Sequence, residues 1–234
     1  MARVVMAFLL LIVHCTLSNF AGAKFMHIPN AFAIVFILSS ICANYDVWAE
    51  PEQKEQKPQI ESESLEVAGV NFQKKVDIDK STLLLNGAGI RNYKTFGLTV
   101  KIYVAALYLN KRMNVNQDIL ADSGVKYLKM RYFRGIDQDD MREAWRYYLM
   151  KNCPGWDCDS EPQKSAIEAF INTVVEAKEG DEYEYLFYAD KAKIIINKRT
   201  VGEIPGAKFS SLLLSTWIGK VPPSEELKRN LLGT

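Results

Sequence analysis

Two glycines and an arginine form the segment of this chain that is best suited to bind a charged group. In Asn86-Gly87-Ala88-Gly89-Ile90-Arg91, each glycine lets the backbone pass close to a neighbour, because glycine has no Cβ. The arginine that follows offers a fixed fork of donors that suits an anionic ligand group. The alternative is a strand bulge in which Arg91 makes an ordinary surface ion pair. The segment lacks the Gly-Lys-Ser/Thr ending of a phosphate-binding loop.

The pair Cys153 and Cys158, which flanks a Pro-Gly turn, is a second candidate. In an oxidising compartment we expect a structural disulfide, which would close a short loop and stabilise the fold modestly. Free thiols, or a redox or metal role, are the alternatives. A zinc site would need two further ligands, and the two histidines, His14 and His27, both lie before residue 50.

The absence of histidine after residue 50 limits the enzyme chemistry of this chain. Histidine is the commonest general base, and a Ser-His-Asp arrangement requires it. Proton transfer would therefore fall to tyrosine, lysine or a carboxylate. Aromatic side chains at strand and helix spacing belong more often to the core than to a catalytic site. The tyrosines concerned are Tyr103, Tyr108, Tyr127, Tyr132, Tyr147 and Tyr148.

Strands must position most of these residues. Alternating apolar residues predict short strands near the start of the domain, and the long apolar segment 100–109 predicts a central strand. The segment 125–133 alternates with one wetter face. The predicted strands are 65–67, 70–72, 75–78, 100–109, 125–133, 181–189, 193–197 and 200–204.

Amphipathic spacing and capping residues predict the helices. Residues Met141, Ala144, Trp145, Tyr148 and Leu149 form one apolar stripe. Strands and helices come in blocks, which favours an α+β fold with helices packed on an antiparallel sheet. The predicted helices are 115–121, 137–150, 160–178, 209–218 and 224–232.

Residues 1–49 predict a leader for export. Two apolar runs each end in small residues, at Ala23 and at Ala49, as signal-peptidase sites do. The simplest account of this tandem is that translation begins at Met26 and cleavage follows Ala49. Cleavage after Ala23 and an uncleaved anchor are the alternatives. Neither run reaches the ~20 residues of a membrane-spanning helix.

The remaining chain predicts a linker followed by one domain. Residues 50–63 are rich in Glu, Gln, Lys and Pro with Ile60 as the one aliphatic residue, so burial cannot offset the entropy of folding there and we expect disorder. Residues 64–234 form the predicted domain. The whole chain has 29 Lys and Arg against 28 Asp and Glu, without a clustered basic block, which argues against nucleic acid as a partner. A membrane is a partner only through an uncleaved leader.

Three ordered motifs carry a resemblance to a known family. They are LLNGAGIR at 84–91, KIYVAALYL at 101–109 and LSTWIGK at 214–220. Together they resemble the chalcone isomerase superfamily, specifically its exported bacterial chalcone isomerase-like branch. The resemblance implies an open-faced β-sandwich, in which a large antiparallel sheet carries helices layered on one face and a ligand cleft lies between them.

The resemblance carries over only part of the catalytic site of the plant isomerases. In those enzymes an arginine after the glycine pair binds the flavonoid oxyanion, and Arg91 matches it. The strand threonine that positions the catalytic water falls at Tyr103. The catalytic tyrosine and asparagine of a helix start align with Asp139 and Arg146. Because these participants are substituted, the preorganised site is incomplete and chalcone cyclisation is not expected.

The resemblance and the residues together predict an exported, non-catalytic binding protein, periplasmic in a Gram-negative bacterium. Its ligand would be a small amphipathic anion such as a fatty acid, since non-catalytic relatives are associated with fatty acids. Arg91 would bind the anion. The cleft would be lined by Tyr103, Tyr108, Thr216 and Trp217, of which the last two match a cleft-lining pair of the family.

Two other functions stay open at this point. The first is an isomerase or intramolecular lyase for an enolisable substrate, with Arg91 as the oxyanion stabiliser and Tyr103 as the proton donor. The second is a structural envelope domain, in which side chains fill the cleft and Arg91 pairs with a carboxylate. No metal or cofactor is predicted. Haem, which some mitochondrial relatives bind, would find only Met, Tyr, Lys or Cys as axial ligands in the domain.

Overall fold

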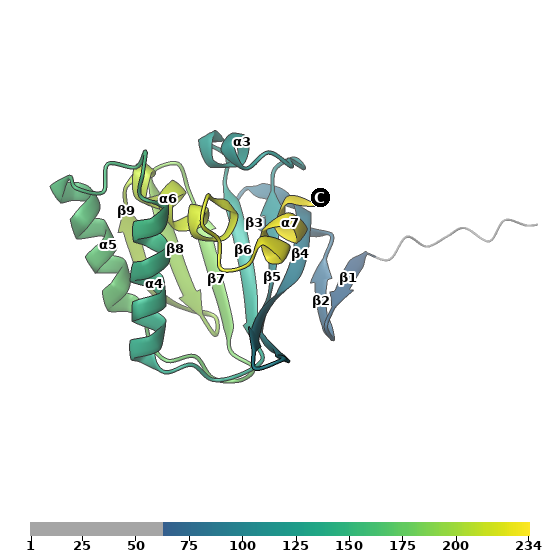
Figure 1. Ribbon diagram of the computed structural model, residues 1–234. Helices are drawn as coiled ribbons and strands as arrows, with labels where there is room; N and C mark the ends of the chain where they lie inside the picture. The colour runs from purple at the N-terminus through teal and green to yellow at the C-terminus, as the bar shows by residue number, and fades with distance from the viewer. Residues whose placement is uncertain (1–62) are drawn as a thin grey trace, which may run out of the picture. The chain divides into compact units, whose positions relative to one another are not determined.

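A seven-stranded antiparallel sheet forms the centre of the fold (Figure 1). The computed structural model describes residues 63–234, and the predicted leader and all but the last residue of the predicted linker lie outside the described residues. Each strand pairs with the next one along the chain. The strands are β3 (Lys75–Ile78), β4 (Ser81–Thr95), β5 (Leu98–Leu109), β6 (Lys126–Tyr132), β7 (Glu182–Phe187), β8 (Lys191–Ile196) and β9 (Arg199–Pro205).

A separate hairpin precedes the sheet. Its strands β1 (Ser64–Val67) and β2 (Val70–Gln73) pair antiparallel around a two-residue turn. Ala68 and Gly69 in that turn both have positive φ, at 53° and 81°, which is the geometry of a two-residue hairpin turn. Phe72 of this hairpin is buried against apolar residues of the large sheet.

The helices confirm the predicted α+β class, because they pack on one face of the sheet (Figure 1). Within residues 63–234, no helix is both long enough and apolar enough to cross a membrane. The helices are α3 (Asn116–Ala121), α4 (Gln138–Asn152), α5 (Glu161–Thr173), α6 (Ala207–Ile218) and α7 (Glu225–Leu232).

Two of the helices begin at side-chain caps. Asp137 accepts a hydrogen bond from the backbone N–H of Asp140 at the start of α4, and Ser224 accepts one from Leu227 at the start of α7. These oxygens satisfy N–H groups that have no partner in the first turn of a helix. The α3 helix begins without such a cap, and the Asn116 amide instead donates to the carbonyl of Ile218 at 3.0 Å.

The α5 helix is shorter than the sequence predicts. The expected helix ran to residue 178, but α5 ends at Thr173, and Val174 is already extended. Ala177 instead pairs with Ile136 in an isolated β-bridge, in which each residue donates its N–H to the other's carbonyl at 2.9 Å. The prediction was wrong here because this pairing, which is distant in sequence, replaces the last helical turn.

Alternation along β5 divides the interior into two apolar clusters. Tyr103, Ala105 and Leu107 face the helices and belong to the larger cluster. Val104 and Tyr108 face the other way and pack beneath the β1–β2 hairpin. Successive side chains of a strand point to opposite faces, so one continuous apolar strand supplies both clusters.

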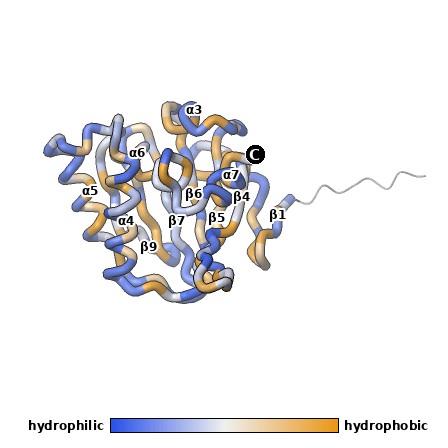
Figure 2. The backbone as a smooth tube through the Cα atoms, in the orientation of Figure 1, coloured by the Kyte–Doolittle hydropathy of each residue, from blue (hydrophilic) through white to orange (hydrophobic). Residues whose placement is uncertain are grey.

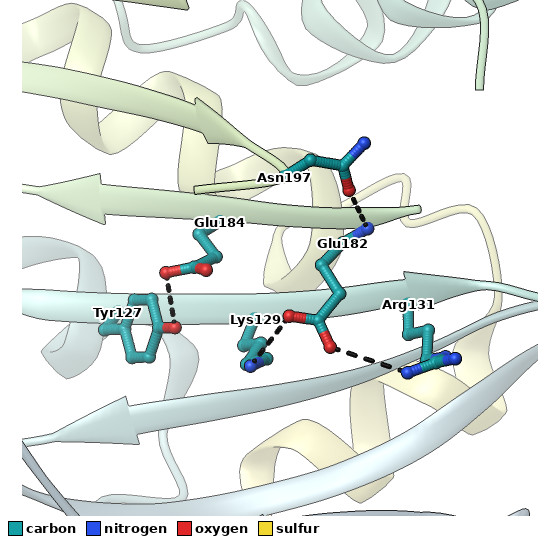
Figure 3. Close-up of polar contacts among 6 residues, drawn as sticks. All are labelled: Tyr127, Lys129, Arg131, Glu182, Glu184 and Asn197. Atoms are coloured by element: carbon teal, nitrogen blue, oxygen red, sulfur yellow. Dashed lines mark hydrogen bonds and ion pairs between the residues drawn. The ribbon is translucent and has the colours of Figure 1, made fainter. Parts of the chain in front are cut away.

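The face of the sheet away from the helices carries a ladder of charged residues (Figure 3). Glu182 of β7 lies between Lys129 and Arg131 of β6, at 3.1 Å and 3.6 Å. The hydroxyl of Tyr127 donates to Glu184 at 2.7 Å, and burial together with that carboxylate raises the pKa of Tyr127. The wetter face predicted for the segment 125–133 is therefore this side, which is partly open to solvent.

Candidate ligand-binding site

The glycines of the Asn86–Arg91 segment bring a helix, not a ligand, close to the sheet. A Cβ at Gly87 would lie 1.9 Å from the backbone oxygen of Asn230 in α7, and one at Gly89 would lie 2.6 Å from the Asn230 Cβ. The segment is part of the continuous strand β4. Its two glycines are therefore the surface on which α7 rests.

Asn86 fixes the same contact by hydrogen bonds. Its side chain is buried, donates to the carbonyl of Leu231 at 2.8 Å and accepts from the N–H of Met113 at 2.8 Å. A buried amide without such partners would destabilise the fold. Asn86 thus links the start of β4 to the end of the chain.

Arg91 lies beyond this contact, at an irregularity in β4. The pairing of β4 with β5 shifts register between Arg91 and Asn92, and bulges of this kind redirect a side chain. The strand is thus irregular in this region, as the bulge alternative expected. However, no carboxylate within the described part of the chain lies at ion-pairing distance from Arg91. Its Nη1 donates to the carbonyl of Asn92.

A cavity of about 240 Å³ opens beside Arg91, between the sheet and the helices. Its walls come from β4, β5, β6, α4, α6 and the segment before α7, and most of them are apolar or aromatic. Protein sites for small ligands have this character, with few polar groups in an apolar lining. The lining residues are Arg91, Tyr93, Ile102, Tyr103, Met130, Tyr132, Ile136, Met141, Ala144, Trp145, Tyr148, Thr216, Trp217 and Pro223.

Tyr103 and Tyr132 are the two buried phenols of this cavity. Tyr103 lies nearer to the charge of Arg91. Burial raises its pKa well above the ordinary value, although the positive charge of Arg91 and a hydrogen bond with Trp217 oppose the rise. Burial raises the pKa of Tyr132 on the neighbouring strand as well. Both phenols therefore keep their protons at neutral pH and act as hydrogen-bond donors, not as bases.

Trp217 and Thr216 contribute differently to the wall. The Trp217 ring packs 5.2 Å from Trp145 and 5.0 Å from Tyr185, measured between ring centroids. Such contacts fix the orientation of an aromatic wall. The Thr216 hydroxyl donates to the carbonyl of Leu213 in its own helix at 2.7 Å, so towards a ligand it can only accept a hydrogen bond.

Tyr108 does not line the cavity, contrary to the sequence prediction. It packs in the other apolar cluster, 5.5 Å from the ring of Tyr127. Tyr103 and Tyr108 are five residues apart on one regular stretch of β5, and an odd separation places them on opposite faces. The prediction was wrong because it took both tyrosines of the motif and ignored this parity.

The sequence analysis identified the α4 residues as an apolar stripe and did not predict their part in the site. Met141, Ala144, Trp145 and Tyr148 all line the cavity, and they have the i, i+3, i+4, i+7 spacing of one helix face. Tyr132 is opposite Tyr103 in the register of β5 and β6. Spacing identified the stripe, but it could not show that space remains in front of it.

Neither Asp139 nor Arg146 lines the cavity. Both are exposed, and Arg146 pairs with Glu168 of α5 at 2.9 Å. The positions to which the resemblance assigned a catalytic tyrosine and asparagine therefore face away from the site. The tyrosine that α4 does present to the cavity is Tyr148.

Asn152 at the end of α4 holds the loop that completes the wall. Its amide donates to the carbonyl of Val221 at 2.9 Å and accepts from the Val221 N–H at 3.0 Å. Pro223, two residues further on, lines the cavity. The distance between α4 and this loop is thus set by a buried side chain.

Cys153 and Cys158 form a disulfide just after α4, with their Cα atoms 5.8 Å apart. This confirms the predicted pairing. Neither cysteine lines the cavity. No group of three or more potential metal ligands occurs within residues 63–234.

The curled antiparallel sheet, the helices on one side and the cavity with its arginine define a chalcone isomerase-like fold. A family model described as chalcone isomerase-like matches residues 64–233, and the chain belongs to that family. Among solved structures, a fatty-acid binding protein of Arabidopsis thaliana is similar, with a TM-score of 0.56 and 17% identity. The alignment covers 73% of this chain and 96% of that one. No curated protein matches the sequence.

Proposed function

We propose that this protein is a non-catalytic binding protein for a small amphipathic anion, such as a fatty acid. The observation that carries the proposal is Arg91, which faces an apolar cavity without a carboxylate partner in the described chain. A partly buried guanidinium is stabilised by an anion, because a charge withdrawn from water needs a partner. The fatty-acid binding protein with the same fold supports this choice of ligand class.

The cavity volume supports a ligand of limited length. An apolar cavity of about 150 Å³ holds benzene with its six carbons, and on that scale 240 Å³ holds roughly ten carbon atoms. We therefore propose a medium-length acyl chain, with its carboxylate at Arg91 and its tail between α4 and the sheet. The tail of a longer chain would have to leave through the mouth of the cavity.

We further propose that the protein acts outside the cytoplasm, in the periplasm if the organism is Gram-negative, as a member of the exported bacterial branch of the family. The disulfide between Cys153 and Cys158 supports this, because disulfides persist in oxidising compartments. The proposed function requires no cofactor.

An isomerase or lyase would use the same arginine. Arg91 is close enough to Tyr103 to lower its pKa, so a donor pair for a developing oxyanion exists. However, burial keeps the phenol protonated, and no histidine is available as a base within residues 63–234. The arrangement therefore favours binding, and a turnover assay with enolisable phenolic and keto substrates distinguishes the two functions.

Calorimetric titration with octanoate, decanoate and palmitate tests the binding function. We expect decanoate to bind, and Arg91→Ala to weaken it by about 2 kcal/mol, or roughly thirtyfold, since a charge-assisted hydrogen-bonded pair is lost. Arg112→Ala removes an equal charge at an exposed position outside the cavity and should leave the affinity unchanged.

A second pair of variants tests the place of binding. Ala144 is exposed on α4 yet lines the cavity, whereas its neighbour Glu143 is exposed and does not. Ala144→Trp should therefore reduce decanoate binding, and Glu143→Trp should not. If Arg91→Ala and Ala144→Trp both bind decanoate as tightly as the parent, the proposed function is wrong.

A further inference from the structure

The turn between β4 and β5 carries the most exposed apolar side chains of the described chain. Phe96 is fully exposed, at 102% of its reference area, and Leu98 is 66% exposed. Gly97 has no atom within 4 Å of the position of an added Cβ. In Figure 1 the turn is the free lower end of the hairpin, and Figure 2 shows hydrophobic residues there. The tip formed by residues 95–98 thus projects into solvent.

Phe96 is also an unfavourable residue for this turn. Thr95 pairs with Leu98, and between them Phe96 and Gly97 both have positive φ, at 45° and 77°. Turns of this type favour asparagine, aspartate or glycine, because a bulky side chain is strained at positive φ. In the β8–β9 turn of the same sheet both central residues also have positive φ, and the first of them is Asn197, with φ 49°. Neither backbone geometry nor burial explains a phenylalanine at the tip.

The flanking residues give the hairpin a positive charge. Arg91 and Lys94 on β4 and Lys101 on β5 are its charged side chains, and apart from three weakly acidic tyrosines (Tyr93, Tyr103 and Tyr108) it contains no acidic residue. Tyr93 is 52% exposed. A segment that enters the interface of a lipid bilayer typically has apolar side chains at its tip and tyrosine and lysine side chains just behind them.

The hairpin and the cavity share residues. Arg91 and Tyr93 line the cavity, and Tyr93 lies in register with Val100 only a few residues from the tip. A surface that holds the tip would therefore lie near the cavity. This continuity favours a lipid surface as the partner, because amphipathic anions of the proposed kind reside in bilayers.

We propose that the tip formed by residues 95–98 docks on a lipid bilayer, with Phe96 and Leu98 inserted among the lipid chains and Lys94 and Lys101 at the headgroups. Docking would present the cavity to the bilayer from which a ligand is taken or to which it is delivered. The purpose assigned to docking and one argument for a lipid partner rest on the proposed function, whereas the exposed apolar tip and its flanking lysines are independent of it.

Flotation with lipid vesicles tests the proposal. Residues 63–234 contain both apolar clusters and the whole family match, so this segment is used alone to avoid the apolar leader. We expect it to float with vesicles of equal parts phosphatidylcholine and phosphatidylglycerol. Phe96→Asn should reduce the partition at least about tenfold, the scale on which a buried phenylalanine contributes, while Phe96→Trp should retain it.

Phe96→Asn also separates docking from a structural role. Because asparagine suits positive φ, this variant should melt at a temperature equal to or above that of the parent. Val201→Asn, which replaces an apolar side chain 39% exposed on β9, is the control and should float like the parent. Lys94→Gln with Lys101→Gln should remove most of the preference for the anionic vesicles over pure phosphatidylcholine.

Two outcomes would overturn the proposal. The first is a parent segment that floats with neither vesicle composition, which would favour a protein partner for the tip. The second is equal flotation of the parent and Phe96→Asn. Decanoate titration of Phe96→Asn in solution separates the docking proposal from the proposed function. If this variant no longer floats with vesicles but binds decanoate like the parent, docking is supported, whether or not Arg91→Ala weakens decanoate binding.

Discussion

Replacing Gly87 with alanine tests whether β4 and α7 are packed as closely as the structure shows. The new Cβ would lie 1.9 Å from the Asn230 backbone oxygen, whereas ordinary Cβ contacts begin near 3.4 Å. The strand and the helix would therefore have to separate by about 1.5 Å, because a close-packed interior leaves no spare volume. The obstacle is backbone, so no side-chain rotation relieves it.

The expected cost follows from what the separation disturbs. Overpacking a well-packed contact destabilises by about 1–3 kcal/mol, and weakening the buried hydrogen bond from Asn86 to Leu231 adds about 1 kcal/mol. We expect the free energy of unfolding of Gly87→Ala to fall by about 3 kcal/mol, which for a domain of this size corresponds to a melting point lower by about 10 °C. Without the clash, replacing a strand glycine with alanine would stabilise the protein slightly. The sign of the change in unfolding free energy therefore already shows whether the clash exists.

Urea and thermal unfolding followed by circular dichroism measure this effect. Gly135→Ala is the matched control, since its added Cβ would lie 3.3 Å from the nearest atom, the carbonyl oxygen of Ala177. Gly89→Ala combined with Asn230→Gly should recover part of the loss of Gly89→Ala, because the obstacle there is the Asn230 side chain. A Gly87→Ala variant that melts within about 2 °C of the parent, a shift that corresponds to no more than about 1 kcal/mol, would refute the close packing.

Two further predictions concern pH and the disulfide. Burial raises the pKa of Tyr183 and of Tyr108 to about 12, whereas an unfolded tyrosine ionises near about 10. The two buried tyrosines should therefore stabilise the fold fully below a pH of about 10, and this stabilisation should be lost as the pH rises through about 12. Urea titrations at a series of pH values should show the free energy of unfolding falling as the pH rises from about 10 to about 12. Replacing Cys153 and Cys158 by alanine should lower the free energy of unfolding by about 2 kcal/mol, as expected for a loop with a sequence separation of 5, and should leave decanoate affinity unchanged; a change in affinity would connect the loop to the cavity.

The sequence predicts the elements of this fold better than their contacts. The alternation in the segment 125–133 identified the faces of β6 correctly, and Ser224, a capping residue by type, marks the true start of α7. Such signals are local, because they depend on strand period and on backbone N–H groups within one turn. The end of α5 was predicted wrongly because the bridge between Ile136 and Ala177 depends on a partner that is distant in sequence.

In the candidate site, too, the sequence predicts local features better than contacts between distant elements. The sequence identified Arg91 as the charged residue of the glycine segment, and the structure places it in the cavity. The reason for the glycines, however, is the α7 helix, more than a hundred residues later in the chain. Trp145 and Tyr148 have the spacing of core residues whether the space in front of them is filled or empty. A pattern fixes which side a residue faces, but the volume left on that side depends on every neighbouring element.

The contact of α7 with β4 means that the ligand site is finished last. Asn86 and Leu231, which join the two elements, are 145 residues apart, and the cavity takes Arg91 from the first long strand and Trp217 from the helix before α7. During synthesis β4 emerges well before the helix that covers its glycines, since a chain is made from its N-terminus. A ligand of the proposed kind would therefore bind only after α6 has packed on the sheet, and it would stabilise that state. Occupancy of the cavity would then report that folding is complete.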